Sequence, residues 1–220
     1  IINLSASPYA KNQQAKREEV IATFAKATDS LIAYCNQTGG NTELIFDGKS
    51  GLYGENGPLS STPAFTSCAL DIDTTTLERN SQEKEPWEEQ MLQALTLGMR
   101  DYFNKLGLSR AVLGLSGGID SALVAYIASC AIGAENVLGV LMPSEYSSEH
   151  SITDALALAQ NLRMPTKSLP IQACFAQTKA TLQENQGNLQ PITEENLQAR
   201  IRGVLLMALA NDEQRVLLNT

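Results

Sequence analysis

The sequence predicts an α/β protein built in two parts, and three observations lead to this prediction. From residue 111 onward, short apolar segments alternate with helical segments, a pattern typical of βαβ units and a parallel sheet. Residues 1–72 instead mix one amphipathic helix with strands and end in a hairpin. Between the two parts, residues 73–85 are polar and lack apolar periodicity, so they predict a linker.

The first part is predicted from its apolar spacing and its turn residues. Val20, Ile21 and Phe24 recur at helical spacing, so 11–28 predict an amphipathic helix. Asn56-Gly57 suits the positive φ values of a tight hairpin, so we expect a turn at 54–57. We expect another turn at Gly39-Gly40-Asn41, and strands at 1–4, 31–35, 43–47, 58–65 and 68–72.

The second part begins with a helix, because Pro86 suits a first helical turn and Glu88 and Glu89 suit the positive end of the helix dipole. Residues 183–190 are rich in Gln and Asn and predict a loop. We expect strands at 111–115, 137–142, 166–171 and 216–218, and helices at 121–131, 151–162 and 193–210.

Composition excludes several classes of function. The 220 residues are 43% hydrophobic and 18% charged, which is ordinary for a globular protein. Lys plus Arg number 16 against 24 Asp plus Glu, a net charge of −8 that argues against broad nucleic-acid or membrane-surface binding. No stretch reaches the roughly 18 apolar residues of a membrane helix. We therefore expect small-molecule partners, with no nucleic acid and no membrane.

The four cysteines, Cys35, Cys68, Cys130 and Cys174, form no CxxC pair, and the single histidine, His150, leaves little for a zinc site. We expect buried thiols in a reducing compartment and an exposed His150 without a catalytic role. Cys35 lies in an apolar strand, which predicts a core residue rather than a nucleophile. Both ends of the sequence fall in predicted strands, so we expect a segment of a longer protein.

One loop, Ser116-Gly117-Gly118-Ile119-Asp120-Ser121, lies between an apolar strand and an apolar helix. Its glycines let a ligand approach the backbone N–H groups, and the helix start directs free N–H groups at the same place. A carboxylate there suits an anion only if a cation lies between them, so the loop predicts a phosphate cradle with a Mg²⁺ ligand at Asp120. The alternative is an ordinary strand–turn–helix corner in which Ser and Asp cap the helix.

The loop resembles the Ser-Gly-Gly-x-Asp-Ser pyrophosphate loop of the N-type ATP pyrophosphatases. The rest of the chain resembles one branch of them, the glutamine-dependent NAD⁺ synthetases. The segments that carry this resemblance are 3–9, 34–40 and 43–48 in the first part and 141–144, 195–202 and 217–220 in the second.

This resemblance implies an α/β fold in which residues 1–72 are the end of a nitrilase-like αββα sandwich, the glutaminase domain. Residues 86–220 would be the start of a Rossmann-like synthetase domain of the adenine nucleotide α-hydrolase kind, after the linker at 73–85. The glutaminase Glu–Lys–Cys triad would lie before residue 1.

The implied activity is that of a ligase, the ATP-dependent amidation of deamido-NAD⁺ to NAD⁺ with ammonia from glutamine. It uses ATP and Mg²⁺, releases AMP and pyrophosphate, and implies a cytoplasmic homo-oligomer. The alternatives are another amidotransferase of this loop class, such as GMP synthetase, and a nucleotide-binding fragment that is inactive by itself.

The resemblance also implies roles for individual residues. The implied ATP contacts are Gly114, Leu115, Ser116, Gly117, Gly118, Ile119, Asp120, Ser121, Leu141, Met142 and Thr220. For Met142, a core position is the alternative.

Asn196 and Arg200 would bind deamido-NAD⁺ from one helix face, the alternative being a solvated face. We expect Arg202 to point elsewhere, as a surface or interface residue. Ser7 and Gln13 would face glutamine. Because Gln13 stands where the family commonly has Lys or Arg, Lys11 or Lys16 would have to compensate.

Overall fold

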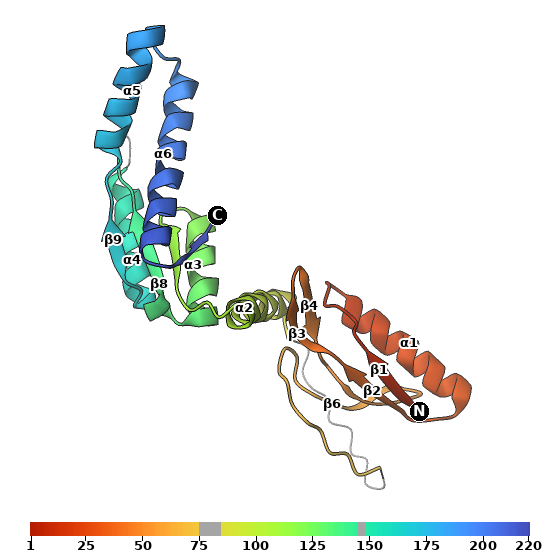
Figure 1. Cartoon of the computed structure of the whole chain (residues 1–220). Coiled ribbons are helices and arrows are strands. Elements are labelled where there is room, and N and C mark those ends of the chain that lie inside the picture. Colours follow the sequence, from red (N-terminus) through yellow and green to blue (C-terminus); the bar gives the residue numbers. More distant parts are fainter. Residues whose placement is uncertain (75–84, 145–147) are drawn as a thin grey trace. The chain divides into compact units, whose positions relative to one another are not determined.

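The computed structural model describes residues 1–74, 85–144 and 148–220. It divides the chain into two compact units, Ile1–Lys105 and Leu106–Thr220 (Figure 1). The linker predicted at 73–85 lies mostly outside the described residues. Among the described residues, no helix is long and apolar enough to cross a membrane.

The first unit is a mixed sheet with helix α1 packed on it. Its elements are β1 (Ile2–Ser5), α1 (Gln13–Thr28), β2 (Ile32–Asn36), β3 (Thr38–Asn41), β4 (Leu44–Asp47), β5 (Gly51–Gly54), β6 (Gly57–Ser61) and α2 (Trp87–Lys105). The main sheet has the order β1-β2-β5-β6, in which β1 and β2 are parallel and the other pairs antiparallel. Ile21 and Ala25 of α1 pack on Ile32, Tyr34 and Tyr53 of the sheet, and these five residues form one buried cluster of the unit.

Strand β3 corrects the turn predicted at residues 39–41. Gly39 and Gly40 pair with β4 instead, and helix α2 lies directly against them. A Cβ atom on Gly40 would lie 3.1 Å from the Cα atom of Gly98 in α2, and the Gly40 N–H donates to Asp101 at 2.7 Å. The glycines are therefore explained by the close approach of a helix rather than by a turn.

Two further predictions for this unit have different outcomes. The hairpin turn at 54–57 is confirmed, since β5 ends at Gly54 and β6 begins at Gly57. The strand at 68–72 is wrong, because these residues have no regular structure and are mostly exposed. Helix α2 packs on β3 and β4 and is grouped with the first unit.

The second unit confirms the predicted parallel sheet. Its elements are β7 (Ala111–Gly114), α3 (Ile119–Ile132), the 3-10 helix η1 (Ala134–Asn136), β8 (Val137–Leu141), α4 (Glu149–Leu162), β9 (Thr166–Ser168), α5 (Gln172–Gln186), α6 (Pro191–Asp212) and β10 (Val216–Leu218). All pairs in the order β10-β7-β8-β9 are parallel. With the first unit, this confirms the α/β fold class.

Both faces of this parallel sheet are covered. Val112 and Val140 pack on Leu206 of α6, while Ala111 and Val137, which point to the opposite face, are also fully buried. The chain runs from β7 to β8 to β9 in one direction and then returns across the sheet to β10. This reversal places a topological switch point between β7 and β10, where open α/β sheets bind ligands at the carboxyl ends of the strands.

Helix α5 was not predicted, and its last residues fall in the loop predicted at 183–190. The helix is polar along most of its length, and its buried anchor is Phe175, which packs with Ile171 and Ile201 of α6. Figure 1 shows α5 and α6 side by side as a helical pair. A single apolar contact of this kind leaves too weak a periodicity to be recognised in the sequence.

Candidate active site

The loop between β7 and α3 is held by hydrogen bonds among its own residues. The Oγ atoms of Ser116 and Ser121 lie 3.0 Å apart, and the Gly118 N–H donates to Ser116 Oγ at 3.2 Å. Gly118 is the N-cap of α3 and, being a glycine, has no side chain with which to cap the helix. The serine hydroxyls thus bond within the loop, and the first N–H groups of α3 are the donors that a helix N-terminus offers to an anion.

Gly117 cannot be replaced without moving the loop. Its φ is +79°, and a Cβ atom would lie only 2.3 Å from the carbonyl oxygen of Ser151 in α4. Ser148 caps α4, since its Oγ accepts the Ser151 N–H at 3.2 Å. The loop thus packs directly against the first turn of α4. Gly117 is required here for two reasons, its positive φ and its close approach to the backbone of α4.

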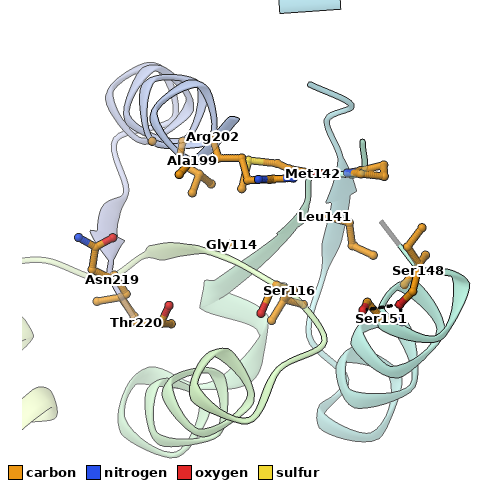
Figure 2. Close-up of a pocket in the computed structure, with 16 residues that line it drawn as sticks. Gly114, Ser116, Leu141, Met142, Ser148, Ser151, Ala199, Arg202, Asn219 and Thr220 are labelled. Carbon is orange, nitrogen blue, oxygen red and sulfur yellow. Dashed lines mark hydrogen bonds between the residues drawn. The ribbon is translucent and has the colours of Figure 1, made fainter. Parts of the chain in front are cut away.

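A pocket of about 740 Å³ opens at this edge of the sheet (Figure 2). This is within the usual size range of small-molecule sites. It is bounded by the ends of β7, β8 and β10 and by one face of α6. Six predicted ATP contacts line it: Gly114, Leu115, Ser116, Leu141, Met142 and Thr220.

Other predicted contacts lie around a smaller neighbouring pocket of about 280 Å³. These are Gly117, Gly118, Ile119 and Ser121, which share it with Asp154 of α4. The side chain of Ile119 is 81% exposed, so its backbone rather than its side chain is available to a phosphate. The ATP roles of the loop residues stay predictions.

Asp120 lies exposed in the first turn of α3, beside the phosphate loop. Among the described residues, no group of three or more His, Cys, Asp or Glu side chains is gathered as a metal cage. A single carboxylate beside a phosphate loop nevertheless fits Mg²⁺, which commonly takes one or two carboxylates and completes its shell with substrate phosphates and water.

Met142 and Arg202 have positions that the sequence left open or missed. Met142 both lines the pocket and packs on the core clusters of the unit, so the two interpretations weighed for it are compatible. Arg202 was expected to point to the surface or an interface, but it is partly buried and lines the pocket. Asn196 and Arg200 are exposed on α6 and do not line this pocket, so their role stays a prediction.

In the first unit, Ser7 and Gln13 line a pocket of about 270 Å³ together with Lys16 and Arg17. Lys11 is occupied elsewhere, because its Nζ atom lies 3.9 Å from the ring centroid of Trp87. Of the two lysines considered as substitutes for a cation at position 13, Lys16 is therefore the one that faces this pocket.

One residue that lines this pocket, Arg17, belongs to a buried ion pair. Arg17 Nη2 donates to Asp47 at 2.7 Å and Nη1 donates at 3.1 Å, with both side chains almost fully buried. Asn36 donates to Asp47 at 3.2 Å and bonds the Ser7 backbone at 2.8 and 3.1 Å. Burial acts to lower the pKa of Arg17, but its hydrogen bonds to Asp47 and the charge of that carboxylate raise it above its ordinary value.

The cysteine prediction is wrong for all four thiols, which are exposed and outside any disulfide. Cys35 alternates with buried residues along β2, so it points to the opposite face of the sheet from Tyr34. Its apolar neighbours suggested a strand buried on both faces, whereas α1 covers only one. His150 is exposed, as expected.

Comparisons with known proteins agree with this architecture. A family model described as NAD synthase matches residues 91–220. The glutamine-dependent NAD(+) synthetase of Synechocystis sp. is 47% identical and that of Thermotoga maritima 41% identical, over 100% and 96% of this chain and 41% and 43% of their own lengths. The chain thus spans less than half the length of these relatives.

A solved structure gives the same result. Glutamine-dependent NAD+ synthetase from Acinetobacter baumannii, in complex with ADP, matches with a TM-score of 0.91 and 36% identity, over 100% of this chain and 43% of that one. The resemblance inferred from the motifs is confirmed. Because the family model covers more than half of its residues, the chain belongs to the NAD synthase family.

Proposed function

We propose that this chain is part of a glutamine-dependent NAD⁺ synthetase, which amidates deamido-NAD⁺ at the expense of ATP. Residues 1–72 would belong to the glutaminase domain and residues 86–220 to the synthetase domain. The observation that carries the proposal is the glycine loop at a helix N-terminus, opening into a pocket of about 740 Å³ at the switch point of the sheet.

In this reaction the nicotinate carboxylate of deamido-NAD⁺ attacks the α-phosphate of ATP, and the bond to the β-phosphate breaks. Pyrophosphate leaves with the electron pair of that bond. Ammonia then attacks the adenylated carboxyl carbon, and AMP leaves, so that the products are NAD⁺, AMP and pyrophosphate.

The residues of the loop would act on the leaving pyrophosphate. Hydrogen bonds among Ser116, Gly118 and Ser121 hold the loop that leads into α3, and with it the backbone N–H groups at the start of that helix. Fixed donors stabilise charge that develops in the transition state without reorganising. Asp120 would hold Mg²⁺, whose charge offsets that of the phosphates when it is bound.

The remaining substrates belong to the same proposal. Deamido-NAD⁺ would contact Asn196 and Arg200 of α6. Glutamine would be hydrolysed in the domain to which the first unit belongs, with Ser7 and Gln13 at its pocket. A cytoplasmic homo-oligomer is also part of the proposal. GMP synthetase is not favoured, because the relatives that match over nearly the whole chain carry the NAD(+) synthetase name.

The proposal is tested with the intact enzyme by following pyrophosphate release from ATP in the presence of deamido-NAD⁺ and Mg²⁺. We expect Asp120→Asn to lower this rate about 100-fold or more with either glutamine or ammonia, because a carboxylate that holds the metal contributes several kcal/mol to the transition state. Unchanged release with both nitrogen donors would remove Asp120 from the reaction.

A second pair of variants tests the division between the two units. Arg200→Ala should impair NAD⁺ formation equally with glutamine and with ammonia, because it acts on the dinucleotide. Ser7→Ala should impair only the glutamine reaction, because free ammonia bypasses the glutaminase. An ammonia reaction spared by Arg200→Ala, or abolished by Ser7→Ala in a folded enzyme, would contradict the proposed roles.

A further inference from the structure

Arg202 is the one charged side chain among the described residues that line the large pocket. It lies on the same face of α6 as Ala199 and Leu206, which also line the pocket. Figure 2 shows its side chain extending from α6 toward Met142, at the end of β8. Its Nε atom donates to the Met142 carbonyl oxygen at 3.4 Å.

The guanidinium of Arg202 lacks a carboxylate partner, which Arg17 and Arg215 both possess. Arg17 is bonded to Asp47, and Arg215 is bonded to Glu213 at 2.8 Å. No ion pair joins Arg202 to a carboxylate within residues 1–74, 85–144 and 148–220. Burial lowers its pKa, which is the direction expected when nothing offsets the desolvation of the charge. Its remaining N–H groups are therefore available to a ligand.

The surroundings of Arg202 fit an aromatic base better than a phosphate. The hydroxyls and free N–H groups of the phosphate loop lie at the end of β7 and the start of α3, whereas Arg202 is tied to the end of β8. Leu141, Met142 and Leu206 give this end of the pocket an apolar lining. A planar guanidinium stacks well on an aromatic ring, and apolar side chains suit the other face of that ring.

We propose that Arg202 binds the adenine base of ATP, with its guanidinium plane on one face of the ring, while its bond to the Met142 carbonyl fixes the strand end beside the base. This inference rests on the proposed function, because it takes the large pocket to be the ATP site. It adds a contact at the base end, in contrast to the backbone contacts at the phosphate end.

The test compares ATP with inorganic tripolyphosphate, which has the phosphates but no base. Binding of each, with Mg²⁺, is measured by calorimetry on the intact enzyme and its Arg202→Gln, Arg202→Lys and Arg110→Gln variants. We expect both Arg202 variants to bind ATP about tenfold more weakly and tripolyphosphate with unchanged affinity, because stacking is lost and the phosphate loop is intact. Arg110 is exposed before β7, so its variant should bind both ligands normally.

Each other outcome has a definite meaning. Unchanged ATP binding in the Arg202 variants would overturn the inference, and so would an equal loss for ATP and tripolyphosphate, which would place Arg202 on the phosphates. A wild-type enzyme that binds neither ligand would overturn the proposed function itself. Circular dichroism checks that each variant is folded. If Arg202→Gln unfolds, the result for Arg202→Lys decides, because a lysine keeps the positive charge but lacks the planar guanidinium group.

Discussion

The pockets around the phosphate loop in the second unit and the pocket around Ser7 in the first unit are built in different ways. In the second unit, the glycine loop and the start of α3 line the smaller pocket. The large pocket beside it is formed by three strand ends, the start of α4 and one face of α6, with Arg202 its one charged lining residue in the described chain. The pocket of the first unit is made from charged and polar side chains above the buried Arg17–Asp47 pair. The site in the second unit therefore depends on φ values and close packing, and the pocket in the first unit depends on a compensated charge.

The charged pocket also carries unused hydrogen-bonding groups. Arg17 Nε and the Tyr34 hydroxyl are buried without a partner in the described structure, and both residues line the pocket. The Arg17 guanidinium lies 5.6 Å from the centre of the Tyr34 ring. Such groups are costly to bury, so side chains here are held in place by the ion pair and by Asn36 rather than by complete hydrogen bonding.

The largest effect should come from the phosphate loop of the second unit. Gly117→Ala would force a Cβ atom to within 2.3 Å of the Ser151 carbonyl oxygen. We expect pyrophosphate release by the intact enzyme to fall about 100-fold or more, because fixed donors lose their positions.

Gly187→Ala is a matched control for this change. Gly187 has a similar φ of +75°, but a Cβ atom there would meet nothing within 4 Å. Its ψ of −149° is one that residues with a side chain rarely adopt, so the change should cost about 1–3 kcal/mol of backbone strain and leave catalysis unchanged. Equal losses of activity in the two variants would show that strain alone, rather than the approach of α4, explains Gly117.

The next effect concerns the buried ion pair. Asp47→Ala leaves the Arg17 guanidinium buried without a carboxylate, so we expect the first unit to lose about 3–5 kcal/mol of stability. Hydrogen exchange of the amides in β2 and β4 of the intact enzyme measures this loss locally. Lys167→Gln, which breaks the half-exposed Lys167–Glu213 pair and leaves the Arg215–Glu213 pair intact, should cost about 1 kcal/mol or less in the second unit. Similar costs in both would contradict the contrast drawn between the two units.

The smallest effect concerns the lysine that faces the charged pocket. Lys16→Gln should raise the KM for glutamine about tenfold, the value of one charge-assisted hydrogen bond, and leave the ammonia reaction unchanged. Lys11→Gln should change neither reaction, because Lys11 lies on Trp87. If Lys11→Gln alone raised the KM for glutamine, the assignment of the compensating cation would be reversed.

The sequence alone was sufficient for features that depend on local chemistry. The alternation of strands and helices after residue 111 predicted the parallel sheet, and the spacing of glycines, serines and Asp120 predicted the loop at the start of α3. Both follow from backbone preferences and periodicity within a few residues, so no distant contact is needed to predict them.

Tertiary structure decided what depends on distant partners. Gly39 and Gly40 form a strand because α2 packs on them, Cys35 is exposed because α1 covers the other sheet face, and α5 depends on the burial of Phe175. Arg202 and Arg200 are two residues apart on α6, and only the packing of that helix at the end of β8 turns Arg202 into the pocket. Burial and proximity are properties of the packed chain, because the sequence around a residue does not specify which distant element packs against it.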